Sequence, residues 1–73
     1  MSPRLPSLNA RQIIKILRNH GFVLARQSGS YAIFRHSDGR RTTIPVHGKK
    51  DIGRGLLRQI MRDTEISLDD LLK

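Results

Sequence analysis

Two short turns, each built around a glycine, constrain this chain more than any other feature. Gly29-Ser30 and the segment 37–40 (Ser-Asp-Gly-Arg) each lie between runs of apolar and long side chains. Asp-Gly between strand-like runs is a strong hairpin signal, because both residues tolerate the positive φ that a tight turn requires. We therefore predict three consecutive strands joined by hairpins, at about residues 22–27, 30–36 and 41–47.

The third of these strands has a clear alternation. Thr42, Ile44 and Val46 alternate with residues of the other parity, so one face of this strand is predicted to point inward. Pro45 donates no backbone hydrogen bond, which favours an edge strand or an irregularity at this position. In the middle strand Ile33 and Phe34 are both apolar and must point to opposite faces, and the pattern leaves open which of them is buried.

Helix signals flank the strands on both sides. Asn9 is a good N-cap, and Gln12 stands three residues later, where its side chain can reach back to the cap. Gly21 fits the position that ends a helix in the left-handed conformation. A second helix is predicted at about 54–64, with an apolar face of Leu56, Leu57, Ile60 and Met61. Ser67 is the N-cap of a last short helix.

The predicted order is therefore α-β-β-β-α within a single domain spanning residues 1–73. Packing both helices on one face of an antiparallel three-stranded sheet is the simplest way to bury two apolar stripes. This α+β arrangement has the topology of a double-stranded-RNA-binding domain.

The charge of the chain points to a polyanionic partner. Fourteen lysines and arginines stand against six acidic residues, which gives a net charge of +8. Most of the basic residues are arginine, whose planar fork suits phosphate. Basic stripes are predicted on both longer helices, with Lys49 and Lys50 preceding the second. The two stripes are Arg11, Lys15 and Arg18 on the first helix, and Arg54, Arg58 and Arg62 on the second.

Other classes of function find no support in the sequence. The chain has no cysteine, and its three histidines lack a zinc-binding spacing, so we expect neither a metal nor a cofactor. The first residues lack the apolar segment of a signal peptide, and no run approaches membrane length. A cytoplasmic protein without a membrane partner is therefore expected.

Two histidines are candidates for acid–base chemistry. His36 and His47 are predicted to end the second and third strands and to lie near each other if the hairpin register is simple. Paired imidazoles are able to move protons on a ribose, although the sequence alone favours the simpler interpretation that they are polar residues at hairpin ends. His20, at the end of the first helix, is predicted to take part in capping it.

At this point a resemblance to a known family becomes apparent. The segments Arg26–Tyr31, Phe34–Lys50 and Gly55–Ile60, with Arg-His-Ser-Asp-Gly-Arg at their centre, resemble the HicA toxin family, also called the YcfA-like family. The resemblance extends from Leu5 to the last short helix. It implies a small bacterial toxin with the double-stranded-RNA-binding-domain-like fold, which cleaves mRNA as an endoribonuclease and is held inactive by a HicB-type antitoxin protein.

The chain departs from this family at the residue to which catalysis is assigned. The family carries a Gly-Ser-His motif on the second strand, whereas this sequence has Gly29, Ser30 and Tyr31. Histidine, with an ordinary pKa near 6.5, suits proton transfer at neutral pH. A phenol with the ordinary pKa of about 10 is ionised in only about one molecule in a thousand at pH 7.

The resemblance thus places the scissile site at Tyr31, with Ser30 and Gly29 fixing the turn before it. Phosphate contacts are predicted for Arg26, Arg35, Lys49 and Lys50. The chain is then a disabled toxin, a family member that binds RNA or an antitoxin without cutting, or an enzyme that uses Tyr31, His36 or His47. A plain double-stranded-RNA-binding module is the alternative outside the toxin class. DNA binding fits the charge, but neither helix shows a base-reading set of side chains.

Overall fold

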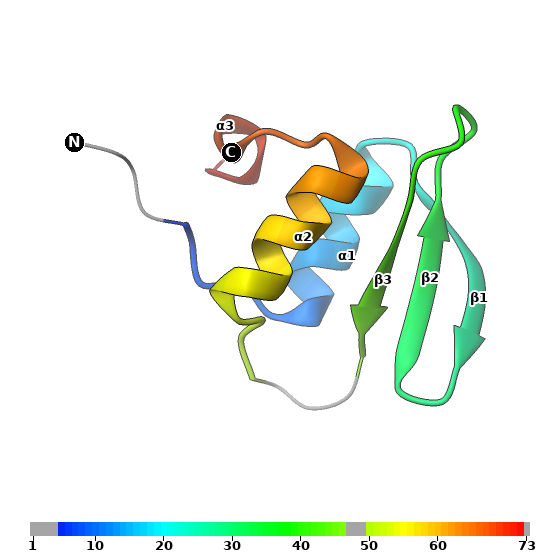
Figure 1. The fold of residues 1–73 in the computed structure, drawn as a ribbon, viewed down its shortest axis with the longest axis horizontal. Helices are drawn as coiled ribbons and strands as arrows, with labels where there is room; N and C mark the ends of the chain where they lie inside the picture. Colours follow the sequence, from blue (N-terminus) through cyan, green and yellow to red (C-terminus); the bar gives the residue numbers. More distant parts are fainter. Residues whose placement is uncertain (1–4, 47–49, 73) are drawn as a thin grey trace.

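The predicted order of elements is confirmed. The computed structural model describes residues 5–46 and 50–72 of the chain. Its elements are α1 (Ala10–Asn19), β1 (Val23–Ser28), β2 (Tyr31–Arg35), β3 (Arg41–Pro45), α2 (Arg54–Thr64) and α3 (Leu68–Leu72) (Figure 1).

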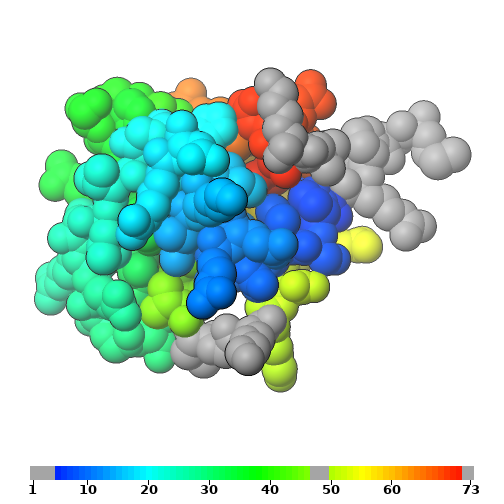
Figure 2. All heavy atoms as spheres, turned by 180° about the vertical axis from the view of Figure 1, so that it is seen from behind, coloured from blue at the N-terminus to red at the C-terminus, as the bar shows by residue number. Residues whose placement is uncertain are grey.

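The strands form one antiparallel sheet in the order β1-β2-β3. All helices lie on the same side of the sheet, and α1 and α2 run beside each other there (Figure 1). From behind, α1 forms the centre of the surface, between the strands and α3 (Figure 2). This is the predicted double-stranded-RNA-binding-domain-like α+β fold. Pro45 lies in an edge strand, as predicted.

Local signals define α1 as the sequence indicates. The Asn9 side chain accepts a hydrogen bond from the Gln12 backbone N–H, and the Gln12 side chain accepts one from the Asn9 backbone N–H, both at 2.9 Å. This reciprocal capping box satisfies two backbone donors that a helix start leaves without partners. At the other end Gly21 has φ +89°, and the Phe22 N–H donates to the Leu17 carbonyl at 2.9 Å.

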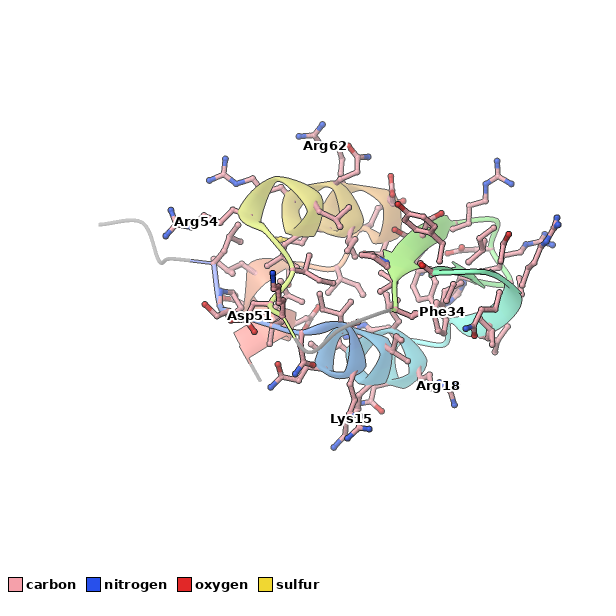
Figure 3. The ribbon with its side chains drawn as sticks, turned by 90° about the horizontal axis from the view of Figure 1, so that it is seen from below. Lys15, Arg18, Phe34, Asp51, Arg54 and Arg62 are labelled. Carbon is pink, nitrogen blue, oxygen red and sulfur yellow. The ribbon has the colours of Figure 1, made fainter. Side chains whose placement is uncertain are left out.

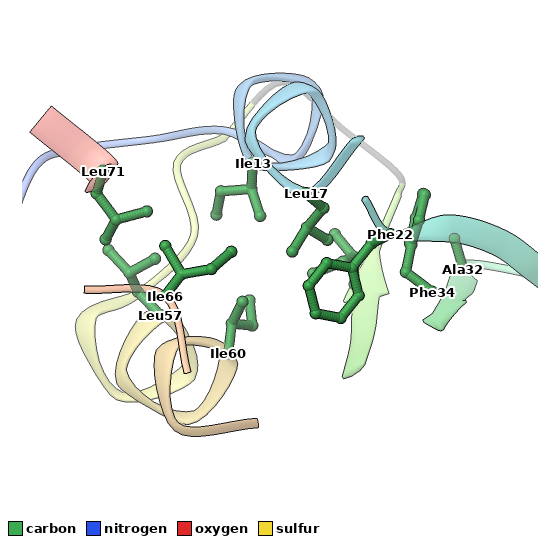
Figure 4. Packing of buried hydrophobic residues seen from close by; sticks show 10 residues of the cluster. Ile13, Leu17, Phe22, Ala32, Phe34, Leu57, Ile60, Ile66 and Leu71 are labelled. Carbon is green, nitrogen blue, oxygen red and sulfur yellow. The ribbon is translucent and has the colours of Figure 1, made fainter. Parts of the chain in front are cut away.

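The core lies between the two longer helices and the inner face of the sheet. Phe34 and Ala32 are buried, whereas Ile33 between them is only partly buried and faces the other way, which settles the parity of β2. The register is consistent with this, because Ala32 pairs with Ile44 and Phe34 pairs with Thr42. The buried apolar residues, shown in Figure 4, are Ile13, Leu17, Phe22, Ala32, Phe34, Ile44, Leu57, Ile60, Ile66 and Leu71.

The first strand differs from the prediction. Phe22 is buried as expected, but it precedes β1, because its N–H completes the cap of α1 and is not free to enter the sheet. Every residue of β1 is exposed. The helices pack on β3, at the other edge of the sheet, so no described element covers β1. A bulge at Ala25 further separates the pairing of Leu24 from that of Arg26.

No helix in the described part of the chain is both long enough and apolar enough to cross a membrane.

Candidate nucleic-acid interface

The side of the sheet that faces away from the helices, here called the outer face, carries several residues that the sequence predicts to contact RNA. Because Ala32 and Phe34 point into the core, Tyr31, Ile33 and Arg35 must point to this outer face. The register then assigns their cross-strand neighbours. Opposite them lie Ser28, Arg26 and Val23 on β1, and Pro45, Thr43 and Arg41 on β3.

Three arginines therefore share the outer face. Arg26 and Arg35, predicted as phosphate contacts from sequence, lie there on neighbouring strands. Arg41 lies directly opposite Arg35 and was not predicted as a contact from the sequence. The turn at Asp38-Gly39 could have indicated it, because counting residues outward from that turn pairs Arg35 with Arg41. All three are exposed, and none has an ion pair or a side-chain hydrogen bond within residues 5–46 and 50–72.

Tyr31 stands at the other end of the same face. Gly29 has φ +57°, which lets a two-residue turn join the paired residues Ser28 and Tyr31. The Val46 N–H donates to the Ser30 carbonyl at 2.7 Å and holds this turn against the end of β3. Tyr31 is 54% exposed. Arg35 lies four positions further along the extended strand, a rise of about 13 Å.

The expected pairing of His36 and His47 stays a prediction. β3 pairs antiparallel with β2, so it starts beside the end of β2 and runs back toward Ser30, where Val46 is bonded. His47 lies outside the described residues. His36 follows the last residue of β2, at the end of the hairpin away from Tyr31, and its N–H donates to the Arg40 carbonyl at 2.8 Å.

His36 is instead built into the packing of the turn. Its ring meets Phe22 edge to face, with 5.1 Å between the ring centroids. Its Nδ1 accepts the Asp38 backbone N–H at 3.1 Å and lies 3.0 Å from the Asp38 carboxylate, a contact that becomes an ion pair only when the ring is protonated. This environment gives the imidazole a structural role.

With this geometry known, the comparison with protein families decides the assignment. The model of the HicA toxin of bacterial toxin–antitoxin systems matches residues 10–66, which cover α1, all three strands and α2. The chain belongs to the HicA toxin family. No curated protein matches it.

The Arg-His-Ser-Asp-Gly-Arg segment of this HicA-family domain connects the sheet to the helices. We call its interacting residues His36, Asp38 and Arg40 the clasp. The Arg40 Nε donates to Asp38 at 2.7 Å, and its Nη1 donates to the Thr64 carbonyl at the end of α2. The guanidinium also lies 5.2 Å from the centre of the Phe22 ring. The Arg40 side chain is thus engaged in contacts that stabilise the fold, so it is a poor candidate for binding RNA.

The carboxylate of this clasp is electrostatically stabilised. The backbone N–H of Arg40 donates to Asp38 at 3.0 Å and lowers the pKa of the carboxyl below its ordinary value, with the Arg40 guanidinium adding to the effect. Desolvation opposes the shift but does not reverse it.

The remaining predicted cations lie elsewhere. Lys50 is exposed before α2, and Lys49 lies outside the described residues. Figure 3 shows Lys15 and Arg18 of α1 on the opposite side of the domain from Arg54 and Arg62 of α2. The basic stripes of the two helices therefore lie on opposite sides of the domain.

Among the described residues, no three histidine or acidic side chains come together in a way that would hold a metal ion.

Proposed function

We propose that this HicA-family domain binds RNA along the outer face of its sheet, with little or no cleavage of its own. The observation that carries the proposal is the cross-strand pair Arg35 and Arg41, two exposed arginines at directly opposed positions that have no partner among residues 5–46 and 50–72. Arg26 stands on the same face, and Lys49 and Lys50 belong to the proposed contact set by charge.

A phosphate is the natural counterion for such a pair. Like charges directly opposite each other in a sheet repel and are destabilising on their own. An RNA backbone removes the repulsion and accepts the planar fork of each arginine. The net charge of +8 adds a long-range attraction to the same polyanion.

Tyr31 is proposed to contact RNA at the site where the family's histidine acts. Its exposed ring is able to stack on a base. Proton transfer to or from a ribose hydroxyl needs a group whose pKa is near neutrality, which a phenol does not supply in its ordinary state. His36 belongs to the clasp at the far end of β2, so it gives no replacement.

Membership of the HicA toxin family implies an antitoxin as partner. We propose a HicB-type protein that covers the outer face around Tyr31 and competes with mRNA for it. Both partners place the protein's action in the cytoplasm.

A paired cleavage assay tests the proposal. The purified protein and its Tyr31→His variant are incubated with a long unstructured RNA, and binding is measured in parallel. We expect both to bind and only the histidine form to cut. Cleavage by the unmodified protein would refute the loss of activity, and His47 would then be the next residue to replace. Binding without cutting by either form would instead support a plain RNA-binding module.

The electrostatic part has its own measurement. Binding of the same RNA should weaken as salt rises. Arg35→Ala should make the negative slope of log K against log salt shallower by about one. Salt-independent binding would remove the proposed role of the outer face.

A further inference from the structure

The flank of α2 that faces away from β3 borders a second surface, separate from the sheet. A hollow of about 730 Å³ lies between α2, the segment leading into α3, and Leu5 of the N-terminal segment. Its lining residues are Leu5, Arg54, Arg58, Met61, Arg62, Glu65, Ile66 and Leu68.

One wall of this hollow is a row of positive charge. Arg54, Arg58 and Arg62 follow each other at intervals of four residues, so their backbones rise about 12 Å along the helix. All three are exposed, and within the part of the chain that the structure describes none has an ion pair. Even Glu65, which lines the same hollow, is not paired with any of them.

The floor of the hollow is apolar. Met61, Leu68 and Leu5 are partly buried, and Ile66 is buried at the margin of the core. A ligand that occupies this hollow therefore meets guanidinium groups along one side and hydrocarbon beneath. Leu5 is part of the floor, so the N-terminal segment helps to build the surface.

The hollow and the outer face of the sheet serve different contacts. α2 lies on the inner side of the sheet (Figure 1), and Arg54 and Arg62 project away from the rest of the domain (Figure 3). A ligand in the hollow leaves Tyr31 and the opposed arginines uncovered.

We propose that this hollow is a docking site for an acidic, amphipathic peptide segment of a partner protein. Such a segment supplies carboxylates to the arginine row and an apolar side chain to the floor, which is how amphipathic segments bind in grooves. Charge complementarity favours an acidic occupant. RNA matches less well, because its backbone has no apolar side chain for the floor.

A random 12-residue peptide display library, panned against the intact chain, tests this directly. We expect enriched peptides that combine at least two acidic residues with a large apolar residue. Their synthetic versions are then titrated by fluorescence anisotropy. The Arg58→Glu/Arg62→Glu variant should weaken binding about tenfold or more, because it reverses two charges of the row.

The matched control is Arg11→Glu/Arg18→Glu, which makes the same charge change on exposed positions of α1. It should alter the affinity less than about twofold, since its charges lie on the other side of the domain. Thermal melts of both variants verify that each is folded.

The inference would be overturned by a lack of enrichment, by enriched peptides that lack acidic or apolar residues, or by equal losses of affinity in both double variants. Unstructured RNA whose affinity falls only in the Arg58→Glu/Arg62→Glu variant would also overturn it, by making the row a nucleic-acid contact. Tyr31 and Arg35 are unchanged in both double variants. The peptide-binding result therefore does not depend on whether the outer face binds RNA.

Discussion

Arg35 and Arg41 lie directly opposite each other on β2 and β3, and neither has an acidic partner in the described chain. Two like charges at directly opposed positions of a sheet cost stability. Replacing one arginine of this pair is therefore expected to raise the stability of the fold and weaken RNA binding. A pair with only a structural role would not show these opposite effects.

Replacing Arg41 with glutamate is expected to stabilise the fold and weaken RNA binding. The change turns a repulsive cross-strand pair into an attractive one, so the free energy of unfolding should rise by about 0.2–1 kcal/mol. Urea denaturation measures the gain, which should shrink at high salt because the charges are exposed. Anisotropy with labelled RNA measures the loss of affinity. A variant that is both less stable and unchanged in binding would contradict this account of the pair.

Arg40 is expected to matter for folding, even though it is also an arginine of the same hairpin. Arg40→Ala removes the donor to the Thr64 carbonyl and the partner of Asp38, so we expect a loss of about 1.5–3 kcal/mol in unfolding free energy. Urea denaturation checks this, with Arg41→Ala as the neighbouring control. Equal effects of the two substitutions would show that the clasp contributes nothing specific.

Asp38 should make the stability depend on pH at the acid end. The hydrogen bond from the Arg40 backbone lowers its pKa in the folded state, so the ionised carboxylate favours folding. This contribution is fully present above the unfolded pKa of about 3.9 and is lost as pH falls through the lowered folded value. Asp38→Asn should therefore lower the melting temperature at pH 6 and have a smaller effect near pH 2. Thermal melts across that range test it, and a constant difference would argue against the carboxylate.

Two glycines with positive φ should respond very differently to alanine. At Gly29 an added Cβ meets no atom within 4 Å, so Gly29→Ala costs only the backbone strain of about 1 kcal/mol. At Gly21 the added Cβ would lie 3.0 Å from Nε2 of His36, a ring fixed against Phe22. We expect Gly21→Ala to cost at least about 1 kcal/mol more.

Chemical denaturation of the two alanine variants side by side provides the measurement. Each serves as the control for the other, because both lose glycine flexibility in the unfolded chain to the same extent. A larger loss at Gly29 would mean that the packing of His36 against the end of α1 is loose.

The local elements of this HicA-family domain could be predicted because their signals are short-range. The capping box of Asn9 and Gln12, and the Asp38-Gly39 turn, depend on residues within a few positions of each other. The second helix has the predicted bounds, 54–64, for the same reason. Three strands joined by two such turns leave little choice of sheet, so the fold class followed from the order of elements.

The candidate site could be predicted only in part. Arg26 and Arg35 were predicted and lie on one face, but Arg41 joins them only through the register across the second hairpin. His36 was a catalytic candidate in the sequence, and the packing of Phe22 and Asp38 around it gives it a structural place.

The sequence by itself determined the charge, the elements and their order. Only the tertiary structure decided that Phe34 and not Ile33 enters the core, and that the arginine row of α2 points away from the cations of α1. Both depend on how helices dock on the sheet. Docking is set by contacts between residues far apart in the chain, and no local pattern encodes the direction in which such a face is turned.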